Sequence, residues 1–118
     1  RQIDTRWTGL GGRRSLETDH GMLFIYPEAR DRRFWMRGCR MDLDIAYVDD
    51  DRRVFKIGSL DAPEPGTPDD DLETFESGGP ARFVLEMEKG WFAARGIAAG
   101  ATLEFSEALA DRAARVEE

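Results

Sequence analysis

The segment from residue 81 to residue 87 constrains the fold more than any other part of the sequence, because its residues alternate as a β-strand requires. Its first set of alternating positions holds Phe83, Leu85 and Met87. The positions between them hold Arg82, Val84 and Glu86. Successive side chains of a strand point to opposite faces of a sheet. The pattern therefore predicts a strand whose large apolar side chains face a core.

Three more segments have strand character. Residues 21–27 form a short apolar run that ends at Pro27, as expected for a buried strand. Residues 34–48 alternate, which predicts one long strand or two strands broken at Gly38. Residues 53–60 resume the pattern after an acidic turn, so we expect a hairpin there.

The remaining segments are expected to be loops or short helices. Residues 61–71 contain three prolines and many acids, which predicts an exposed loop without regular structure. Glycine-terminated helical turns are expected at 5–12 and 90–96, and a last strand near 101–105. The tail, residues 106–118, is charged and is expected to be a helix or to fray.

These elements fit one domain in a chain of 118 residues. We assign residues 1–105 to a single β domain and 106–118 to the tail. The expected fold is mainly β: a compact antiparallel β-sandwich or barrel-like domain with short helices and a C-terminal helix. No apolar run reaches the ~18 residues of a membrane helix. The predicted core residues are Met22, Phe24, Leu43, Ile45, Phe83 and Leu85.

Charge limits the partners, whereas cysteine content leaves the compartment open. A formal net charge of −7 repels a phosphate backbone, so we expect no nucleic-acid partner. The single Cys39 forms no intramolecular disulfide and leaves the redox compartment open. The chain begins at Arg1 without an initiator Met, so we expect a secreted or periplasmic protein if a signal was removed, and a cytoplasmic one otherwise. A monomer or weak oligomer is expected.

The inventory of catalytic groups is small. His20 lies in a polar turn, and Cys39 lies in a strand segment, where a lone cysteine usually packs. We therefore expect neither to be catalytic, and we favour a protein without enzyme activity while leaving the question of an enzyme open. A closed zinc site needs about four Cys or His ligands, and the acidic runs lack the spacing of a calcium loop. We expect no metal and no cofactor.

Polar residues on the predicted strands could instead form a binding site. An aromatic platform beside arginines and carboxylates is typical of a pocket that orients a polar ligand. An irregularity near Gly38, such as a bulge, must bring these residues to one side. The alternative is a solvent-facing ladder of cross-strand ion pairs. The candidate ligand-binding residues are Trp35, Arg37, Asp42, Asp44, Arg82 and Glu86.

Several of these segments together resemble the small domain-of-unknown-function family numbered 192. The resemblance runs from about residue 9 to residue 105. It implies a compact β-sandwich or barrel-like domain with short helices, often preceded by a secretion signal or lipoprotein anchor, and it implies no established activity. The segments that carry it are Gly21–Phe24, Phe34–Arg37, Leu43–Val48, Gly79–Glu86, Gly90–Phe92, Gly96–Ile97 and Gly100.

The sequence also departs from the family pattern. Many members read Phe-Trp-Met-Lys-Asn-Thr, where this chain has Arg37, Gly38 and Cys39 after the methionine, and Asp42 replaces a proline. If the usual asparagine side chain binds a ligand in relatives, Gly38 cannot make that contact here. The favoured interpretation is a non-catalytic module that binds a small polar ligand or a protein. The alternatives are a carboxylate-dependent hydrolase using Asp44 and Glu86, and a structural accessory module that docks on another protein.

Overall fold

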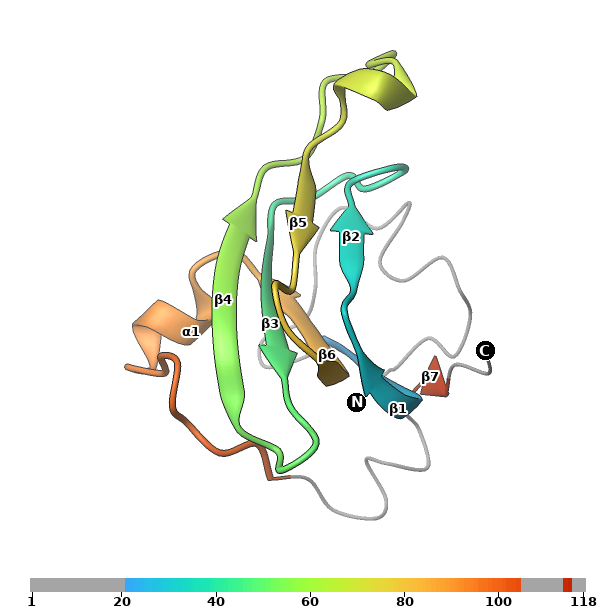
Figure 1. The fold of residues 1–118 in the computed structure, drawn as a ribbon. Coiled ribbons are helices and arrows are strands. Elements are labelled where there is room, and N and C mark those ends of the chain that lie inside the picture. The colour runs from blue at the N-terminus through green and yellow to red at the C-terminus, as the bar shows by residue number, and fades with distance from the viewer. Residues whose placement is uncertain (1–20, 105–113, 116–118) are drawn as a thin grey trace.

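The computed structural model describes residues 21–104 and 114–115, and its main element is a five-stranded sheet in the order β4-β3-β6-β1-β7 (Figure 1). A two-stranded ribbon, β2-β5, forms a second sheet. The strands are β1 (Met22–Arg30), β2 (Arg33–Trp35), β3 (Leu43–Val48), β4 (Val54–Leu60), β5 (Thr74–Glu76), β6 (Ala81–Glu88) and β7 (Ala114–Arg115). The helical elements are α1 (Trp91–Ala94) and the 3₁₀ turn η1 (Asp69–Asp71).

Both faces of the central strands are covered. One face carries a cluster that includes Met22, Leu43 and Ile45, and we call it the ribbon face because Phe34 and Phe75 of the ribbon pack on it. The opposite face carries Leu23, Val48 and Phe83, and we call it the helix face because Phe92 of α1 packs there. All six residues of β3 are buried in consequence. This layered arrangement confirms the predicted mainly β, sandwich-like fold.

The ribbon is fixed to the larger sheet by aromatic packing and by one hydrogen bond. The Tyr47 hydroxyl donates to the Phe75 carbonyl at 2.5 Å, and the two rings lie 5.1 Å apart between centroids. A buried hydroxyl needs such a partner. The Lys56 ammonium donates to the Glu76 carbonyl at 2.6 Å from the neighbouring strand β4. The ribbon is therefore held to the larger sheet through Phe75 and Glu76 of β5.

The predicted strand over residues 34–48 is two strands, as the second of our alternatives proposed. The chain reverses in a turn in which the Cys39 amide donates to the Met36 carbonyl at 3.1 Å. Gly38 adopts a φ of +72°, a conformation that favours glycine. The irregularity near Gly38 is thus a turn and not a bulge. The predicted hairpin between β3 and β4 is confirmed.

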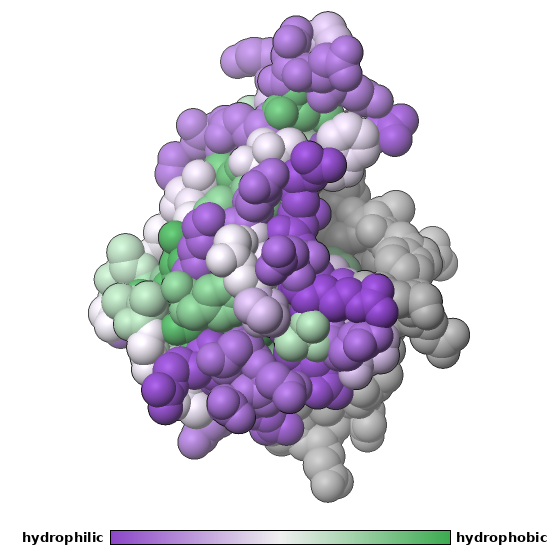
Figure 2. Space-filling model, in the orientation of Figure 1, coloured by the Kyte–Doolittle hydropathy of each residue, from purple (hydrophilic) through white to green (hydrophobic). Residues whose placement is uncertain are grey.

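The loop from residue 61 to residue 71 is exposed along most of its length, as predicted, and projects beyond the sheet (Figure 1). The expected lack of regular structure is wrong at its end, where η1 forms. The Asp71 amide donates to the Pro68 carbonyl at 2.9 Å, which closes this turn. Its surface is largely hydrophilic (Figure 2).

The core prediction is confirmed for all its members except Leu85, which is half-buried. Val84 and Glu86, which we placed on the polar side of the strand, are buried. The reason is that β6 lies between β1 and β3, with both faces covered. In a strand covered on both faces, the alternating side chains all face protein, so the pattern does not distinguish buried positions from exposed ones.

The C-terminal part differs from expectation in two places. The helical turn predicted at 90–96 forms as α1, but the strand expected near 101–105 is only a single bridge between Arg53 and Thr102. In the tail, Ala114–Arg115 pairs in parallel with β1 instead of being helical. The helix predicted at 5–12, His20 and the rest of the tail lie outside the described residues. No helix in the described part of the chain is long and apolar enough to cross a membrane.

Candidate functional site

A hollow of about 630 Å³ lies between two turns at the end of the molecule that carries η1. One wall is formed by residues 37–40, and the other by residues 62–67 with Asp69 and Leu72. We call it the turn hollow. Small-molecule sites are typically concave and have volumes of ~300–1,000 Å³. The size of the turn hollow falls in this range.

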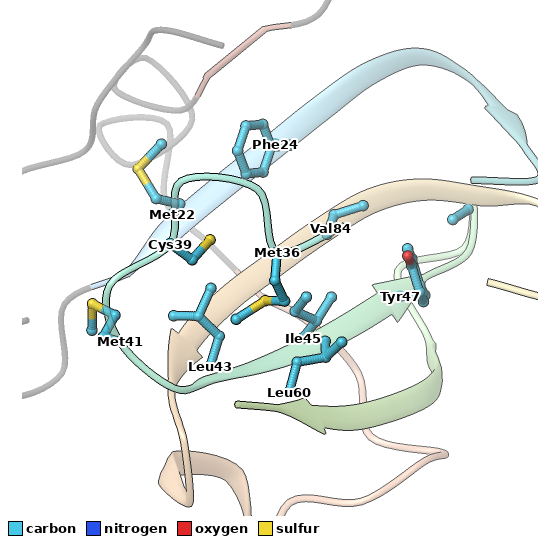
Figure 3. Close-up of a cluster of buried hydrophobic side chains, with 11 residues drawn as sticks. Met22, Phe24, Met36, Cys39, Met41, Leu43, Ile45, Tyr47, Leu60 and Val84 are labelled. Carbon is cyan, nitrogen blue, oxygen red and sulfur yellow. The ribbon is translucent and has the colours of Figure 1, made fainter. Parts of the chain in front are cut away.

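The first wall is a turn pinned to the core on both sides. Met36, Cys39 and Met41 belong to the ribbon-face cluster, and Figure 3 shows them around Leu43, with Met36 also beside Ile45. Their exposed fractions are 0%, 7% and 6%. The residues between these anchors, Arg37, Gly38 and Arg40, are exposed. The turn therefore presents two guanidinium groups from a fixed backbone.

The second wall is a turn that the sequence itself stabilises. Pro65 has a φ restricted to near −65°, and Gly66 follows with a φ of +84°, the combination that a type II turn requires. The Thr67 amide and hydroxyl both donate to the Glu64 carbonyl, at 3.1 and 2.6 Å. Glu64 and Thr67 are thereby held at the two ends of the turn.

The base of the second wall is tied to the sheet through Asp42. Its carboxylate accepts a hydrogen bond from the Ala62 amide at 2.7 Å, and its carbonyl accepts one from the Lys89 amide at 3.2 Å. The Lys89 ammonium also pairs with Asp61 at 2.6 Å. This hydrogen bond and the Asp61 charge raise the pKa of Lys89. These hydrogen bonds therefore fix the backbone at the base of the hollow to the sheet.

The charges of the turn hollow are divided between its walls. Arg37 approaches Asp69 of the opposite wall at 3.7 Å, and its guanidinium carbon lies 5.5 Å from the centre of the Trp35 ring. Trp35 is 42% exposed and is the exposed large hydrophobic residue of the described part of the chain. Arg40 and Glu64 also line the hollow, from opposite walls. The Arg37–Asp69 pair thus spans one part of the hollow, and Arg40 and Glu64 supply charges in another part.

One of the six predicted site residues lines the turn hollow, and two more contact residues that line it. Arg37 lines it, Trp35 contacts Arg37, and Asp42 anchors its second wall. The other three lie elsewhere. The turn at Gly38 accounts for the grouping, because it brings the end of β2 over the start of β3.

Asp44 lies on the helix face, since it is opposite Met87 in the sheet register. It is 3% exposed. Its carboxylate accepts hydrogen bonds from the Ser59 hydroxyl at 2.5 Å and the Gly90 amide at 3.0 Å. Two donors satisfy a buried carboxylate that would otherwise be costly. Asp44 therefore stabilises the turn before α1.

Arg82 lies near the start of β6, whereas Asp44 is opposite Met87 near the end of this strand. It donates to the Tyr26 carbonyl at 2.5 Å and pairs with Asp50 at 2.6 Å. Glu86 is four residues further along this strand, a span of roughly 13 Å at ~3.3 Å per residue. Arg82 therefore joins β1 to the hairpin turn and lies away from the hollow.

Glu86 is buried on the ribbon face, opposite Met22 and Ile45 in the register. No described residue donates a hydrogen bond to its Oε1 atom. Burial raises the pKa of Glu86 to about 8. Burial, and then the charge of Glu86, raise the pKa of the Cys39 thiol to about 11. Both groups are therefore predominantly protonated at neutral pH.

Arg40, Glu64 and Thr67 line the hollow but were not predicted as candidate site residues from the sequence. The signal was present, because Pro65 followed by Gly66 predicts a defined turn. We treated the whole of 61–71 as solvent-exposed loop, and a loop that returns against another turn leaves no local pattern in the sequence.

The chain matches the model of DUF192, described as Uncharacterized ACR, over residues 1–105. The chain belongs to the DUF192 family. This confirms the resemblance drawn from the strand and turn segments. In this DUF192 domain the turn with Arg37, Gly38 and Cys39, where the sequence departs from the common family pattern, forms the first wall of the hollow.

Two solved structures are similar to this DUF192 domain. A Sinorhizobium meliloti protein described as a "putative transcription regulator" has 30% identity and a TM-score of 0.72, covering 86% of this chain and 76% of that one. A Novosphingobium aromaticivorans protein of unknown function has 34% identity and a TM-score of 0.71, covering 83% and 66%. No curated protein matches the DUF192 chain. The comparisons therefore give the family and fold without an activity.

Proposed function

We propose that this domain is a non-catalytic module that binds a small polar ligand in the turn hollow. The observation that carries the proposal is the construction of the hollow: two turns, each with a positive-φ glycine, face each other and present charged side chains. Preorganised walls reduce the entropy that a ligand must overcome on binding. Gly38 and Gly66 have open space where a side chain would lie, so backbone borders the hollow at both.

The arrangement of carboxylates favours binding over the hydrolase alternative. A hydrolase that uses two acids needs both of them on one substrate bond. Asp44 lies on the helix face and Glu86 on the ribbon face, so the sheet separates them. Glu86 is also sealed, with an exposed fraction of 1%. This pair is not arranged to act on a common substrate.

The description of the Sinorhizobium relative concerns transcription, and we do not extend it to contact with DNA. The chain has a formal net charge of −7. Binding to the phosphate backbone depends on clustered Lys and Arg. The segment 61–76, which borders the hollow, contains acidic residues and no basic ones. A small effector is the more compatible ligand.

Amide chemical-shift mapping by NMR tests the proposal. The probes are amino acids, dipeptides, dicarboxylic acids and monosaccharides, each titrated to millimolar concentration. We expect saturable shifts at 37–40 and 62–72, and weaker binding in Arg37→Ala. Arg53→Ala is the matched control, because Arg53 is exposed in the β3–β4 connection. Shifts confined to other surfaces, or no saturable shift with any class of probe, would contradict the proposal.

Protein docking is a second candidate, and the exposure of Trp35 favours it. Tryptophan and arginine are enriched among the residues that dominate interface energies. Trp35 ends β2 of the ribbon, and it contacts Arg37 in the first wall of the hollow. Trp35→Ala should then abolish association with a co-purifying protein while leaving small-ligand shifts in the hollow unchanged. The reverse result assigns Trp35 to the ligand site.

A further inference from the structure

Two opposite charges face the turn hollow without a partner from the described residues. Arg40 lies on the first wall and Glu64 on the second. Neither takes part in any of the ion pairs within 4.0 Å that the described part of the chain forms. In the same hollow, Arg37 and Asp69 approach to 3.7 Å. The two walls are therefore close enough for contact at one place and hold unpaired charges apart at another.

Both unpaired groups are held by rigid turns. Arg40 lies between the buried anchors Cys39 and Met41. Glu64 opens the turn that Pro65 and Gly66 stabilise, and its carbonyl accepts two hydrogen bonds from Thr67. Their backbone positions are thus fixed before any ligand arrives, although the side-chain ends are solvated. The fixed backbone reduces the entropy lost on binding, and the ordering of the two exposed side chains is the cost that remains.

The sign of the two charges selects the ligand. A simple anion attracted to Arg40 is repelled by Glu64, and a simple cation attracted to Glu64 is repelled by Arg40. A molecule with both charges interacts favourably with each wall. A guanidinium binds a carboxylate through paired N–H donors, and a carboxylate accepts from an ammonium group.

We propose that the ligand of the turn hollow is a zwitterion with an α-ammonium and a carboxylate group: a free amino acid or a short peptide with unblocked ends. This inference rests on the proposed function. The carboxylate binds Arg40, and the ammonium group binds Glu64. The volume of about 630 Å³ accommodates a dipeptide, whose charged ends lie further apart than those of an amino acid.

Titration calorimetry with end-blocked peptides tests the inference. The probes are Ala-Ala, its N-acetyl form, which lacks the ammonium group, and its C-terminal amide, which lacks the carboxylate. We expect each block to weaken binding about three- to tenfold at low salt, the range for a charged contact at a partly solvated site. We also expect the loss to shrink as salt is added.

Two variants assign the charges to their partners. Arg40→Gln should weaken Ala-Ala binding and leave binding of the amide unchanged, because the contact it removes is already missing. Glu64→Gln should weaken Ala-Ala binding and leave binding of N-acetyl-Ala-Ala unchanged, because that peptide lacks the ammonium group. Both side chains are exposed, so these variants are expected to fold, and unfolding curves check this. Arg53→Gln is the control for a general loss of positive charge.

Three outcomes would overturn the inference. The first is equal affinity of the wild type for the blocked and unblocked peptides. The second is that Arg40→Gln weakens binding of the C-terminal amide as much as it weakens binding of Ala-Ala. The third is no binding of amino acids or dipeptides at millimolar concentration. Saturable shifts of the hollow amides with dicarboxylic acids or sugars would in that case retain the proposed function and reject the zwitterion. Peptide shifts outside the hollow would reject both.

Discussion

The ring of Phe75 lies directly over Gly58, with its Cζ atom 2.5 Å from the position that a Cβ atom of residue 58 would occupy. Phe75 belongs to β5 of the ribbon, and Gly58 to β4 of the larger sheet. Only a residue without a side chain permits this approach. The contact sets how closely the two layers pack, and through Tyr47 it joins the aromatic cluster that supports the ribbon.

Gly58→Ala should therefore destabilise the protein by about 1–3 kcal/mol, the usual cost of overpacking a core. Gly79→Ala is the matched control, because its Cβ atom would lie 3.4 Å from the Phe55 ring, an ordinary contact. Urea unfolding of the three proteins measures the difference. Equal stability of the two variants would show that the ribbon moves freely away from the sheet.

Glu86 should make stability depend on pH. Its pKa rises from 4.5 to about 8 on folding, so the folded state holds the proton more tightly than the unfolded state. This contribution is fully present below pH 4.5 and is lost as the pH rises through about 8. The total change is of the order of a few kcal/mol, at about 1.4 kcal/mol per pKa unit.

The measurement is the free energy of unfolding of the wild type and Glu86→Gln between pH 5 and pH 8.5. Glutamine keeps the shape and removes the titration, so the fall with pH should be smaller in the variant. Cys39 and Tyr47 face the same cluster, and burial raises the pKa of each. Both groups are present in the wild type and in the variant, so their titration contributes to both profiles and leaves the difference to Glu86. Parallel pH profiles for the two proteins would exclude Glu86 as the source.

Asp44→Ala should cost roughly 1.5–3 kcal/mol, the range for hydrogen bonds to a charged group. The substitution leaves the Gly90 amide and the Ser59 hydroxyl without their acceptor. Asp50→Ala is the control, because Asp50 is exposed and such pairs contribute about 1 kcal/mol or less. Chemical denaturation gives both values. Since Asp44 lies on the helix face, ligand shifts in the turn hollow should persist in Asp44→Asn.

Leu43→Ala and Leu85→Ala should differ in cost. Leu43 is fully buried, so we expect a loss of about 2–5 kcal/mol. Leu85 is half-buried at the edge of the helix-face cluster, so its loss should be the smaller of the two. Denaturant midpoints at constant slope measure both losses. A larger loss for Leu85→Ala would place it in the core after all.

Cys39 should react slowly with a thiol reagent in the native state at neutral pH. The thiolate is the reactive form, and burial raises the pKa of this thiol to about 11. Unfolding in urea should accelerate the reaction strongly. Rapid native labelling at pH 7, without loss of structure, would revive Cys39 as a reactive group.

Local sequence was sufficient for the central strands β1, β3, β4 and β6 and for a break near Gly38. It did not predict β5 or β7, and it predicted a strand near 101–105 that is only a single bridge. The alternation that placed Leu43 and Ile45 on one face, and the glycine that ended the strand before them, act through neighbouring residues alone. The same local chemistry predicted the hairpin and α1. It also marked Trp35, Arg37 and Asp42 as candidates; of these Arg37 lines the hollow, while Trp35 contacts Arg37 and Asp42 accepts a hydrogen bond from Ala62 of the second wall.

Tertiary structure alone decided which polar residues are near each other. The order β4-β3-β6-β1 buries both faces of β6, and this is why Glu86 is sealed while Leu85 is only half-buried. Long-range pairing also carries the Pro65–Gly66 turn back against the turn at Gly38, which places Arg40 opposite Glu64. Residue type and spacing set the conformation of each turn. Whether two turns face each other depends on strand register between distant segments, which no local pattern encodes.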